Sequence, residues 1–383
     1  MKSKRHIKVG VDARTIFTPN PRGTGKNLVD LYGRVVTLRP EWTVTLYHEG
    51  DQSNVPTPDL LNKPGVIRQA ASIRGHRFNT WEQFMLPYRA LRDRLDLLHC
   101  PANTCPAWMP VPTVVTVHDL IPLDGDDYFH PRQVRYFRKS VKRACRRASG
   151  ILTPSHYTRS RLIKEFGADP QNLFVNEWAP DSKMHKVHEH SYGKVLDRYG
   201  IRPPYAIHFG ADAPRKNTDL TLRAWSMVDA KVRQTWQLLV IGLSEHTLKR
   251  FNELVGLQGL DSQVHLHGFA PEDHLPALMS GADVLLFASL SEGFGLPVLD
   301  AWATDTAVIA GNRTSLPEVA GSAAVLVDPT NAASIAEGLE GLMKDGALRT
   351  RLCELGRDRL AAFTWEATAE RYIGVVEELV HKS

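Results

Sequence analysis

The chain has 383 residues, of which 43% are hydrophobic, 23% charged and 8% aromatic, and its formal net charge is +5. This length exceeds the roughly 100–200 residues of one ordinary core and predicts two domains, while the apolar content excludes a disordered chain. No apolar stretch approaches the roughly 20 residues that span a bilayer, and no apolar signal core follows the basic start. Four cysteines without C-x-x-C spacing predict neither a disulfide scaffold nor a zinc site. We therefore expect a soluble, cytoplasmic protein.

Short, continuous apolar runs alternate with helix-length segments along the chain. Such runs are typical of strands buried on both faces, as in a parallel sheet covered by helices. In the first half they lie at 8–12, 43–47, 97–100, 114–118, 151–154 and 174–176. In the second half they lie at 206–210, 238–242, 264–266, 284–288, 307–310 and 324–327. This order predicts an α/β protein of two Rossmann-like, doubly wound parallel-sheet domains facing a central cleft, with ligands at the carboxyl ends of the strands.

The stretch 181–204 is poor in apolar runs and contains three histidines, two glycines and the pair Pro203 and Pro204. We expect it to be the interdomain linker, because domain boundaries fall in polar segments rich in proline and glycine. The predicted domains are then 1–180 and 205–365.

A strongly basic segment covers 132–147. It holds eight Lys or Arg and no acidic residue, a local charge of +8 that leaves the rest of the chain at −3. Apolar residues recur through it at helical spacing, which predicts an amphipathic helix with one face against the protein. Its charged face is either a solvated surface or a docking site for an anionic membrane. Nucleic-acid binding is disfavoured, because aromatic residues are few here and the remaining chain is net acidic.

Two turns that follow predicted strands suit an anion. The first is 210–217 (GADAPRKN), in which Arg215 and Lys216 precede a predicted helix. A solvated basic pair is the plain alternative. Cations oppose the helix dipole at that end, however, which favours a pair that clamps a pyrophosphate as its charge grows.

The second turn is 288–301 (ASLSEGFGLPVLDA). Its glycines permit close approach of the backbone to a ligand, Pro297 suits the first helical turn, and the helix start presents free N–H groups to an anion. An ordinary strand-to-helix turn explains the glycines but not Glu292 at the tip. The pattern predicts a site for a nucleotide diphosphate.

Three other patterns are incomplete. The segment 20–26 lacks the first glycine and the final hydroxyl residue of a P-loop, and Gly23-Thr-Gly25 lacks the third glycine of a dinucleotide fingerprint. The acidic cluster 124–127 matches a metal-binding D-x-D over three residues only, which is common in plain turns. We therefore expect neither a metal nor a cofactor.

Several motifs together resemble the family 4 glycosyltransferases of the GT-B fold. In the second half these are 215–217 (RKN), 268–269 (GF), 291–297 (SEGFGLP) and 315–319 (SLPEV). In the first half, 114–122 (VVTVHDLIP) and 151–155 (ILTPS) resemble strands of the family. The segment 363–365 (FTW) is similar to the motif before the family's terminal helix, which implies that a helix at about 366–383 crosses back onto the first domain. The resemblance covers nearly the whole chain.

The resemblance implies roles for particular residues. Glu292 would contact the donor sugar, Arg215 and Lys216 would bind its diphosphate, and His118 would hydrogen-bond the sugar near the reacting centre. These four residues are the expected catalytic set. The expected donor-binding residues are Gly23, Gly25, Gly268, Phe269, Gly293, Phe294, Gly295, Leu296 and Asp300. Gly23 and Gly25 resemble the family's loop that closes on the diphosphate.

Two positions depart from the family pattern. Asp300 stands where the family commonly has a second Glu, in Glu-x7-Glu, that binds the ribose hydroxyls. Ala211 stands where many members have Arg, and we expect Arg215 to supply that charge.

The resemblance implies a retaining, metal-independent hexosyltransferase of polysaccharide or glycoconjugate assembly, with a nucleotide sugar as donor and a saccharide or lipid-linked saccharide as acceptor. No carboxylate is a clear candidate for the nucleophile of a double displacement, so front-face substitution is expected. The forms at 215–217 and 316–319 resemble mannosyltransferases and favour GDP-mannose. UDP- or dTDP-sugar donors, a nucleotide-sugar epimerase and a non-catalytic binding subunit are the alternatives. The basic segment 132–147 is the expected peripheral contact with the inner face of the cytoplasmic membrane.

Overall fold

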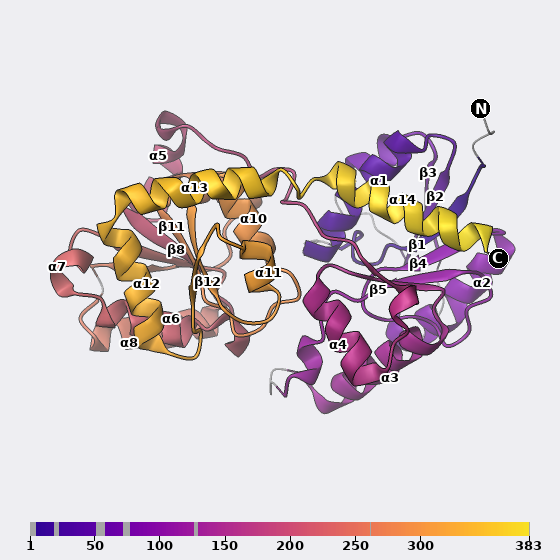
Figure 1. Ribbon diagram of the computed structural model, residues 1–383, viewed down its shortest axis with the longest axis horizontal. Helices are drawn as coiled ribbons and strands as arrows, with labels where there is room; N and C mark the ends of the chain where they lie inside the picture. Colours follow the sequence, from indigo (N-terminus) through magenta and orange to yellow (C-terminus); the bar gives the residue numbers. More distant parts are fainter. Residues whose placement is uncertain are drawn as a thin grey trace. The chain divides into compact units, whose positions relative to one another are not determined.

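The computed structural model describes residues 5–18, 23–50, 58–71, 77–125, 129–260 and 262–382. The chain divides into two compact units, Met1–Trp178 with Thr364–Ser383, and Ala179–Phe363 (Figure 1). Each unit is one parallel sheet covered by helices. The expected α/β class with two Rossmann-like domains is confirmed.

The first unit contains a seven-stranded parallel sheet in the order β3-β2-β1-β4-β5-β6-β7. Its strands are β1 (Lys8–Asp12), β2 (Thr43–His48), β3 (Val66–Ala70), β4 (Leu97–Cys100), β5 (Thr113–Thr116), β6 (Gly150–Thr153) and β7 (Leu173–Val175). Its helices are α1 (Gly23–Leu38), η1 (Asp59–Asn62), η2 (Arg77–Met85), α2 (Leu86–Arg92), η3 (Ile121–Leu123), α3 (Pro131–Arg147), α4 (His156–Phe166), η4 (Pro170–Asn172) and α14 (Trp365–His381). The C-terminal helix α14 packs against α1, where the buried hydroxyls of Tyr32 and Tyr372 lie 2.7 Å apart.

The second unit contains a six-stranded parallel sheet in the order β10-β9-β8-β11-β12-β13. Its strands are β8 (Tyr205–Phe209), β9 (Gln237–Ile241), β10 (Val264–Leu266), β11 (Val284–Phe287), β12 (Ala307–Gly311) and β13 (Val325–Val327). Its helices up to β11 are α5 (Glu189–Arg198), η5 (Pro214–Lys216), α6 (Thr218–Met227), α7 (Ala230–Arg233), α8 (Glu245–Leu257), η6 (Glu272–His274) and α9 (Leu275–Ser280). The remaining ones are α10 (Leu296–Ala303), α11 (Leu316–Ala320), α12 (Ala332–Lys344) and α13 (Gly346–Leu360).

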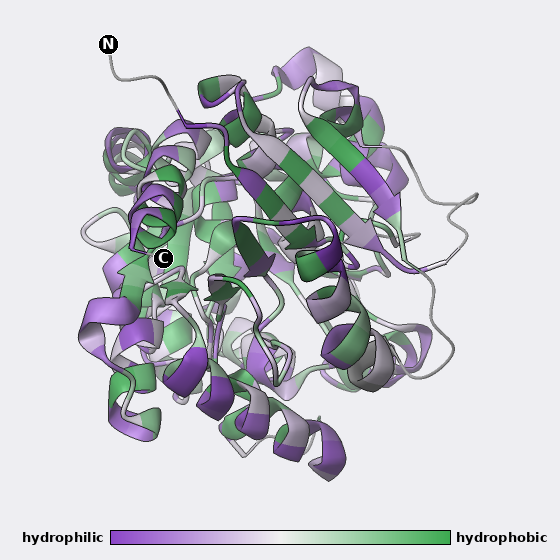
Figure 2. Ribbon diagram, turned by 90° about the vertical axis from the view of Figure 1, so that its right-hand side faces the viewer, coloured by the Kyte–Doolittle hydropathy of each residue, from purple (hydrophilic) through white to green (hydrophobic). Residues whose placement is uncertain are grey.

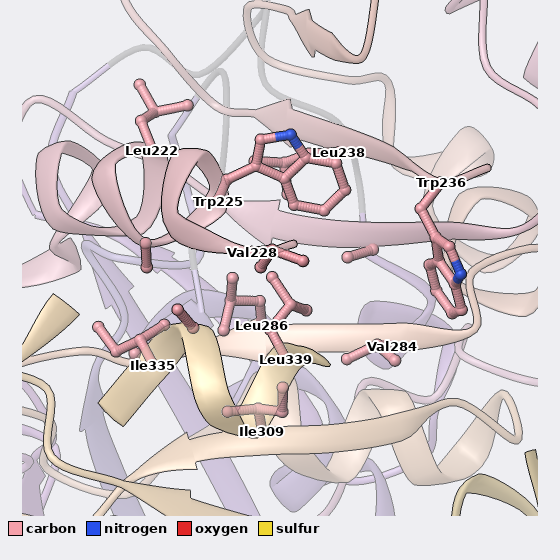
Figure 3. Close-up of a cluster of buried hydrophobic side chains, with 14 of the residues drawn as sticks. Leu222, Trp225, Val228, Trp236, Leu238, Val284, Leu286, Ile309, Ile335 and Leu339 are labelled. Carbon is pink, nitrogen blue, oxygen red and sulfur yellow. The ribbon is translucent and has the colours of Figure 1, made fainter. Parts of the chain in front are cut away.

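The cores of the two units are built from strand residues and the inward sides of the helices. In the second unit, Trp225 of α6 and Leu339 of α12 lie in one buried cluster with Leu286 of β11 and Ile309 of β12 (Figure 3). Figure 2 shows helices that carry hydrophobic and hydrophilic residues together, as expected of helices that cover a sheet. No helix within the described ranges is both long enough and apolar enough to cross a membrane.

The predicted strands are all present, with ends that differ by one or two residues. The strand β3 was not predicted. It lies at the edge of its sheet and its residues are largely exposed, so its sequence lacks a continuous apolar run. The predicted linker 181–204 needs correction, because it contains α5 and belongs to the second unit. A single buried residue of α5, Leu196, faces the protein, and α5 packs against α9.

Candidate active site

Two strand-to-helix connections meet at the carboxyl edge of the second sheet. β8 continues into η5 and α6, and β11 continues through 288–295 into α10. β8 and β11 pair in parallel, and the strand order reverses between them, which is where doubly wound sheets bind their ligands. The connections touch, because the Leu290 N–H donates to the Arg215 carbonyl at 2.8 Å. The two anion-binding turns predicted from the sequence thus lie together.

Three charged side chains from these turns form one cluster. Glu292 Oε1 lies 2.7 Å from Lys216 Nζ and 3.1 Å from Arg215 Nη1. The side chains of Glu292, Lys216 and Arg215 are 12%, 17% and 26% exposed. Burial by itself raises the pKa of Glu292, but the Lys216 ammonium and the Arg215 guanidinium outweigh it and hold this pKa below its ordinary value. The cluster carries two positive charges and one negative charge, and the excess positive charge suits an anionic ligand.

The glycine turn after Glu292 has a backbone that other residues adopt poorly. Gly295 has a φ of 119°, and a Cβ atom there would lie 2.7 Å from Leu316 Cδ2. The turn ends at Leu296, where α10 begins with Pro297 in its first turn. The first N–H groups of a helix have no partner inside the helix and point towards its amino end. The backbone from Phe294 to Leu296 therefore offers hydrogen-bond donors near the charged cluster.

Asn217 joins the parts of this site, and the sequence analysis quoted it in the motif 215–217 without assigning it a role. It adopts a left-handed conformation with a φ of 63°, which Asn tolerates better than most residues. Its side-chain amide donates to the Ala288 carbonyl at 2.9 Å and to the Pro329 carbonyl at 2.6 Å. One buried amide thus fixes Lys216, its neighbour, against the loops that follow β11 and β13.

Thr314 and Ser315 hold the backbone of the Glu292 turn. The sequence analysis did not name Thr314, and it quoted Ser315 in the motif 315–319 without assigning it a role. The Thr314 Oγ1 accepts the Glu292 N–H at 3.1 Å, and the Ser315 hydroxyl lies 2.9 Å from the Glu292 carbonyl and 2.8 Å from the Phe294 carbonyl. Thr314 has a φ of 60°, an unfavourable conformation for a β-branched residue. The surrounding contacts therefore keep Thr314 in a strained conformation, in which its hydroxyl oxygen accepts the Glu292 N–H.

We expect Thr314→Val to destabilise the second unit by about 1–3 kcal/mol, because it leaves the partly buried Glu292 N–H without its acceptor. Valine is also β-branched, so the backbone strain at 314 stays the same. Thr314→Ser retains the hydroxyl and should stay close to the parent. Urea-induced unfolding of the parent and the two variants measures the free energies of unfolding. Equal stabilities of the valine and serine variants would show that the hydrogen bond from the Glu292 N–H to the Thr314 hydroxyl does not stabilise the second unit.

Other predicted donor-binding residues of the second unit lie along the same carboxyl edge. Gly268 follows β10, and its carbonyl accepts the Gly242 N–H at 2.9 Å. The neighbouring Phe269 is 73% exposed. Asp300 lies in α10, where its Oδ1 accepts the Asp181 N–H at 3.0 Å. Its carboxylate therefore also braces the start of the second unit.

Three of the predicted site residues, His118, Gly23 and Gly25, lie in the first unit. His118 follows β5, stacks on Trp178 and donates from Nε2 to the Pro101 carbonyl at 2.6 Å. Burial lowers the pKa of His118 to about 4, so the ring is neutral at pH 7 and its Nδ1 is left as an acceptor. Gly23 begins α1 and Gly25 is buried in its first turn. The preceding part of the glycine segment, 19–22, lies outside the described residues.

In the part of the chain that the structure describes, no three His, Cys, Asp or Glu side chains gather as a metal site. Asp124 of the acidic cluster pairs with Arg161 at 2.6 Å. The residues 126 and 127 of that cluster are not among those described.

Two protein-family models match this chain. The model described as Glycosyltransferase Family 4 matches residues 24–176, and the model described as Glycosyl transferases group 1 matches residues 198–359.

Two relatives are similar over most of their length. O-antigen chain mannosyltransferase B of Escherichia coli is 28% identical over 374 residues, which cover 92% of this chain and 96% of the relative. MMP alpha-(1->4)-mannosyltransferase of Mycolicibacterium hassiacum is 27% identical over 368 residues, which cover 88% and 85%.

A solved structure shows the same fold. The crystal structure of Anabaena Alr3699/HepE in complex with UDP and glucose has a TM-score of 0.75 at 16% identity, over 97% of this chain and all of the other. The two family models, one on each unit, show that this chain belongs to glycosyltransferase family 4 and is a glycosyltransferase. The solved structure shows that its fold is GT-B.

Proposed function

We propose that the protein transfers a mannosyl group from GDP-mannose to a saccharide or lipid-linked saccharide acceptor in polysaccharide or glycoconjugate assembly. The observation that carries the proposal is the convergence of Lys216 and Arg215 on Glu292 beside the amino end of α10. Two adjacent cations and free N–H groups suit the diphosphate of a nucleotide sugar. The relatives named as mannosyltransferases support the sugar.

The charged cluster suggests how the bond between the donor sugar and its diphosphate is broken. In the proposed reaction, the bond between the sugar C1 and the diphosphate oxygen breaks while the acceptor oxygen bonds to C1 from the same face. The acceptor proton passes to the leaving phosphate oxygen, so the anomeric configuration is retained and no metal is needed. Lys216 and Arg215 stabilise the charge that grows on the diphosphate. Glu292 holds both cations in place through its carboxylate and contacts the sugar.

His118 has a defined part in this proposal. Because its Nε2 donates to the Pro101 carbonyl, the neutral ring offers only Nδ1 to a ligand. Nδ1 is an acceptor, so His118 binds a sugar hydroxyl that donates a hydrogen bond to Nδ1. It orients the donor rather than supplying charge.

The first experiment is thermal unfolding with GDP, UDP and dTDP, each with and without its common sugars. A ligand at about 100 times its dissociation constant adds about 2.7 kcal/mol to the free energy of unfolding. We expect the largest thermal shift with GDP and GDP-mannose. In a separate assay, we expect the protein to transfer mannose from GDP-mannose to an acceptor. A shift with none of these nucleotides would overturn the diphosphate site.

A UDP-sugar is the second candidate donor. The fold neighbour bound to UDP and glucose favours it. A larger thermal shift with UDP than with GDP would replace GDP-mannose by a UDP-sugar without changing the assignment of Lys216, Arg215 and Glu292.

Asp300 gives a separate test of the proposed ribose contact. We expect Asp300→Glu to bind the nucleotide diphosphate as tightly as the parent or more tightly, because the longer arm restores the reach of the family's usual Glu. Asp300→Ala should weaken binding by about 10- to 100-fold, the loss of one charged hydrogen bond. Isothermal titration calorimetry measures both. Weaker binding by the Glu variant would show that Asp300 acts mainly through the Asp181 backbone.

A further inference from the structure

One arginine at the edge of the first sheet is held in place without an ionic partner. Arg68 lies in the edge strand β3 and is exposed. Among the residues that the structure describes, no carboxylate pairs with it. Its guanidinium carbon lies 4.7 Å from the centre of the Phe17 ring, and its Nε lies 3.1 Å from His48 Nε2. Because an ordered arginine side chain loses rotamer freedom, this arrangement needs an explanation.

The two residues that hold Arg68 are buried. Phe17 and His48 are 4% and 2% exposed, and their ring centres lie 4.6 Å apart. Arginine has only donors, so the Arg68 Nε–H donates to His48 Nε2, and the imidazole proton lies on Nδ1. Burial lowers the pKa of His48, and the nearby Arg68 charge lowers it further, so the ring is neutral at pH 7. His48 is thus a neutral acceptor that orients the guanidinium.

The guanidinium of Arg68 is held at the carboxyl edge of the sheet. β2 and β3 pair in parallel with Leu46 opposite Arg68, so the Arg68 side chain reaches forward to His48, the last residue of β2. Phe17 comes from the connection that follows β1. The carboxyl edges of parallel sheets are where doubly wound domains bind their ligands. With Nε bonded to His48, the Nη groups remain as donors, and no described residue accepts from them.

Protection of an edge strand explains the charge of Arg68 but not its fixed position. A charged residue on an edge strand discourages pairing with another chain, and a mobile, solvated side chain serves that purpose. A planar group of N–H donors that is already oriented is instead suited to an oxyanion, which it can bind through two parallel hydrogen bonds. Preorganisation favours such binding, because the side chain is ordered when the protein folds rather than when the ligand arrives.

We propose that Arg68, oriented by Phe17 and His48, binds an oxyanion of the acceptor, either a phosphate or a carboxylate group. This inference deepens the proposed function, because it rests on that function for the identity of the ligand as an acceptor and makes the acceptor anionic. The two proposals fail separately. Binding of charged saccharides tests Arg68 of the first unit, whereas nucleotide-induced stabilisation tests the charged cluster of the second unit.

The test compares saccharides that differ in charge at one position. Octyl mannoside 6-phosphate and octyl mannoside form one pair, and octyl glucuronide and octyl glucoside form the other. In isothermal titration calorimetry, the full-length protein should bind at least one charged saccharide about tenfold more tightly than its neutral partner, the effect of one hydrogen-bonded charge. The pair with the larger difference shows whether the acceptor carries a phosphate or a carboxylate. Equal affinities within both pairs, or no binding of either charged saccharide, would overturn the proposal.

Substitutions then identify the residue that binds the charge. Arg68→Gln should remove the preference for the charged saccharide and leave the affinity for the neutral one unchanged. Arg92→Gln, at an exposed arginine of α2 in the same unit, is the matched control and should bind like the parent. Arg68→Lys keeps the charge without the planar group and should bind the charged saccharide less tightly than the parent. Phe17→Leu removes the ring beside the guanidinium and should weaken this binding by about two- to fivefold.

Lys216→Ala separates the Arg68 site from the charged cluster of the second unit. This variant should keep the preference for the charged saccharide. The thermal shift with GDP should be the same in Arg68→Gln as in the parent, because Arg68 lies in the first unit. A preference that survives in Arg68→Gln, or that is lost in Lys216→Ala, would show that the oxyanion binds the charged cluster and would overturn the proposal.

Discussion

Lys216→Ala is expected to lower the turnover of sugar transfer by about 10²–10³-fold, the loss that follows removal of one preorganised donor from a developing negative charge. Lys216 Nζ lies 2.7 Å from Glu292 and 4.8 Å from the centre of the Phe287 ring, so it is held at the junction of the two turns. Because it acts on charge that grows as the bond breaks, kcat should fall more than KM rises.

The fold should survive this substitution. Lys216 is part of η5 rather than of the core, and Arg215 still pairs with Glu292 after the change. Steady-state transfer kinetics measure the effect, and circular dichroism with thermal unfolding verifies the fold. Lys231→Ala, an exposed lysine of the same unit, is the matched control and should retain full turnover. A folded Lys216→Ala protein with near-normal turnover would refute the electrostatic role.

Arg14→Met is expected to destabilise the first unit by about 3–5 kcal/mol, since removal of one partner from a buried ionic cluster leaves uncompensated charge. The buried Arg14 guanidinium donates to Asp12 Oδ1 at 2.8 Å and to Glu82 Oε2 at 3.1 Å, and both carboxylates are buried. Methionine preserves much of the volume beside Trp81 but leaves two buried carboxylates without their cation.

Thermal unfolding and urea titration measure this loss, and the midpoint temperature should fall on the order of 10 °C. Arg92→Met, an exposed arginine on α2, is the matched control and should change stability little. Adding Asp12→Asn and Glu82→Gln to Arg14→Met should recover part of the stability, because the buried groups are then neutral. Equal stabilities of the Arg14 and Arg92 variants would show that the cluster contributes nothing.

The local pattern of the sequence determined the two-domain class and the main turns of the site. Continuous apolar runs predicted the buried strands, because a strand covered on both faces needs apolar residues on both. Glycines and a proline after a strand, with Arg215, Lys216 and Glu292 beside them, predicted the anion site, because backbone freedom, helix start and charge are properties of neighbouring residues. The local pattern did not predict β3 or α5. The residues of β3 are largely exposed, and α5 has a single buried apolar side chain.

Contacts between distant segments were decided only by the tertiary structure. The Asn217 amide reaches the Pro329 carbonyl, and the Thr314 hydroxyl reaches the Glu292 N–H, because strand order places the ends of β8, β11, β12 and β13 at one edge. Arg14 meets Glu82 for the same reason, as the end of β1 lies beside the helix that precedes β4. Periodicity specifies what each segment buries, but the pairing of strands decides which polar groups then become neighbours.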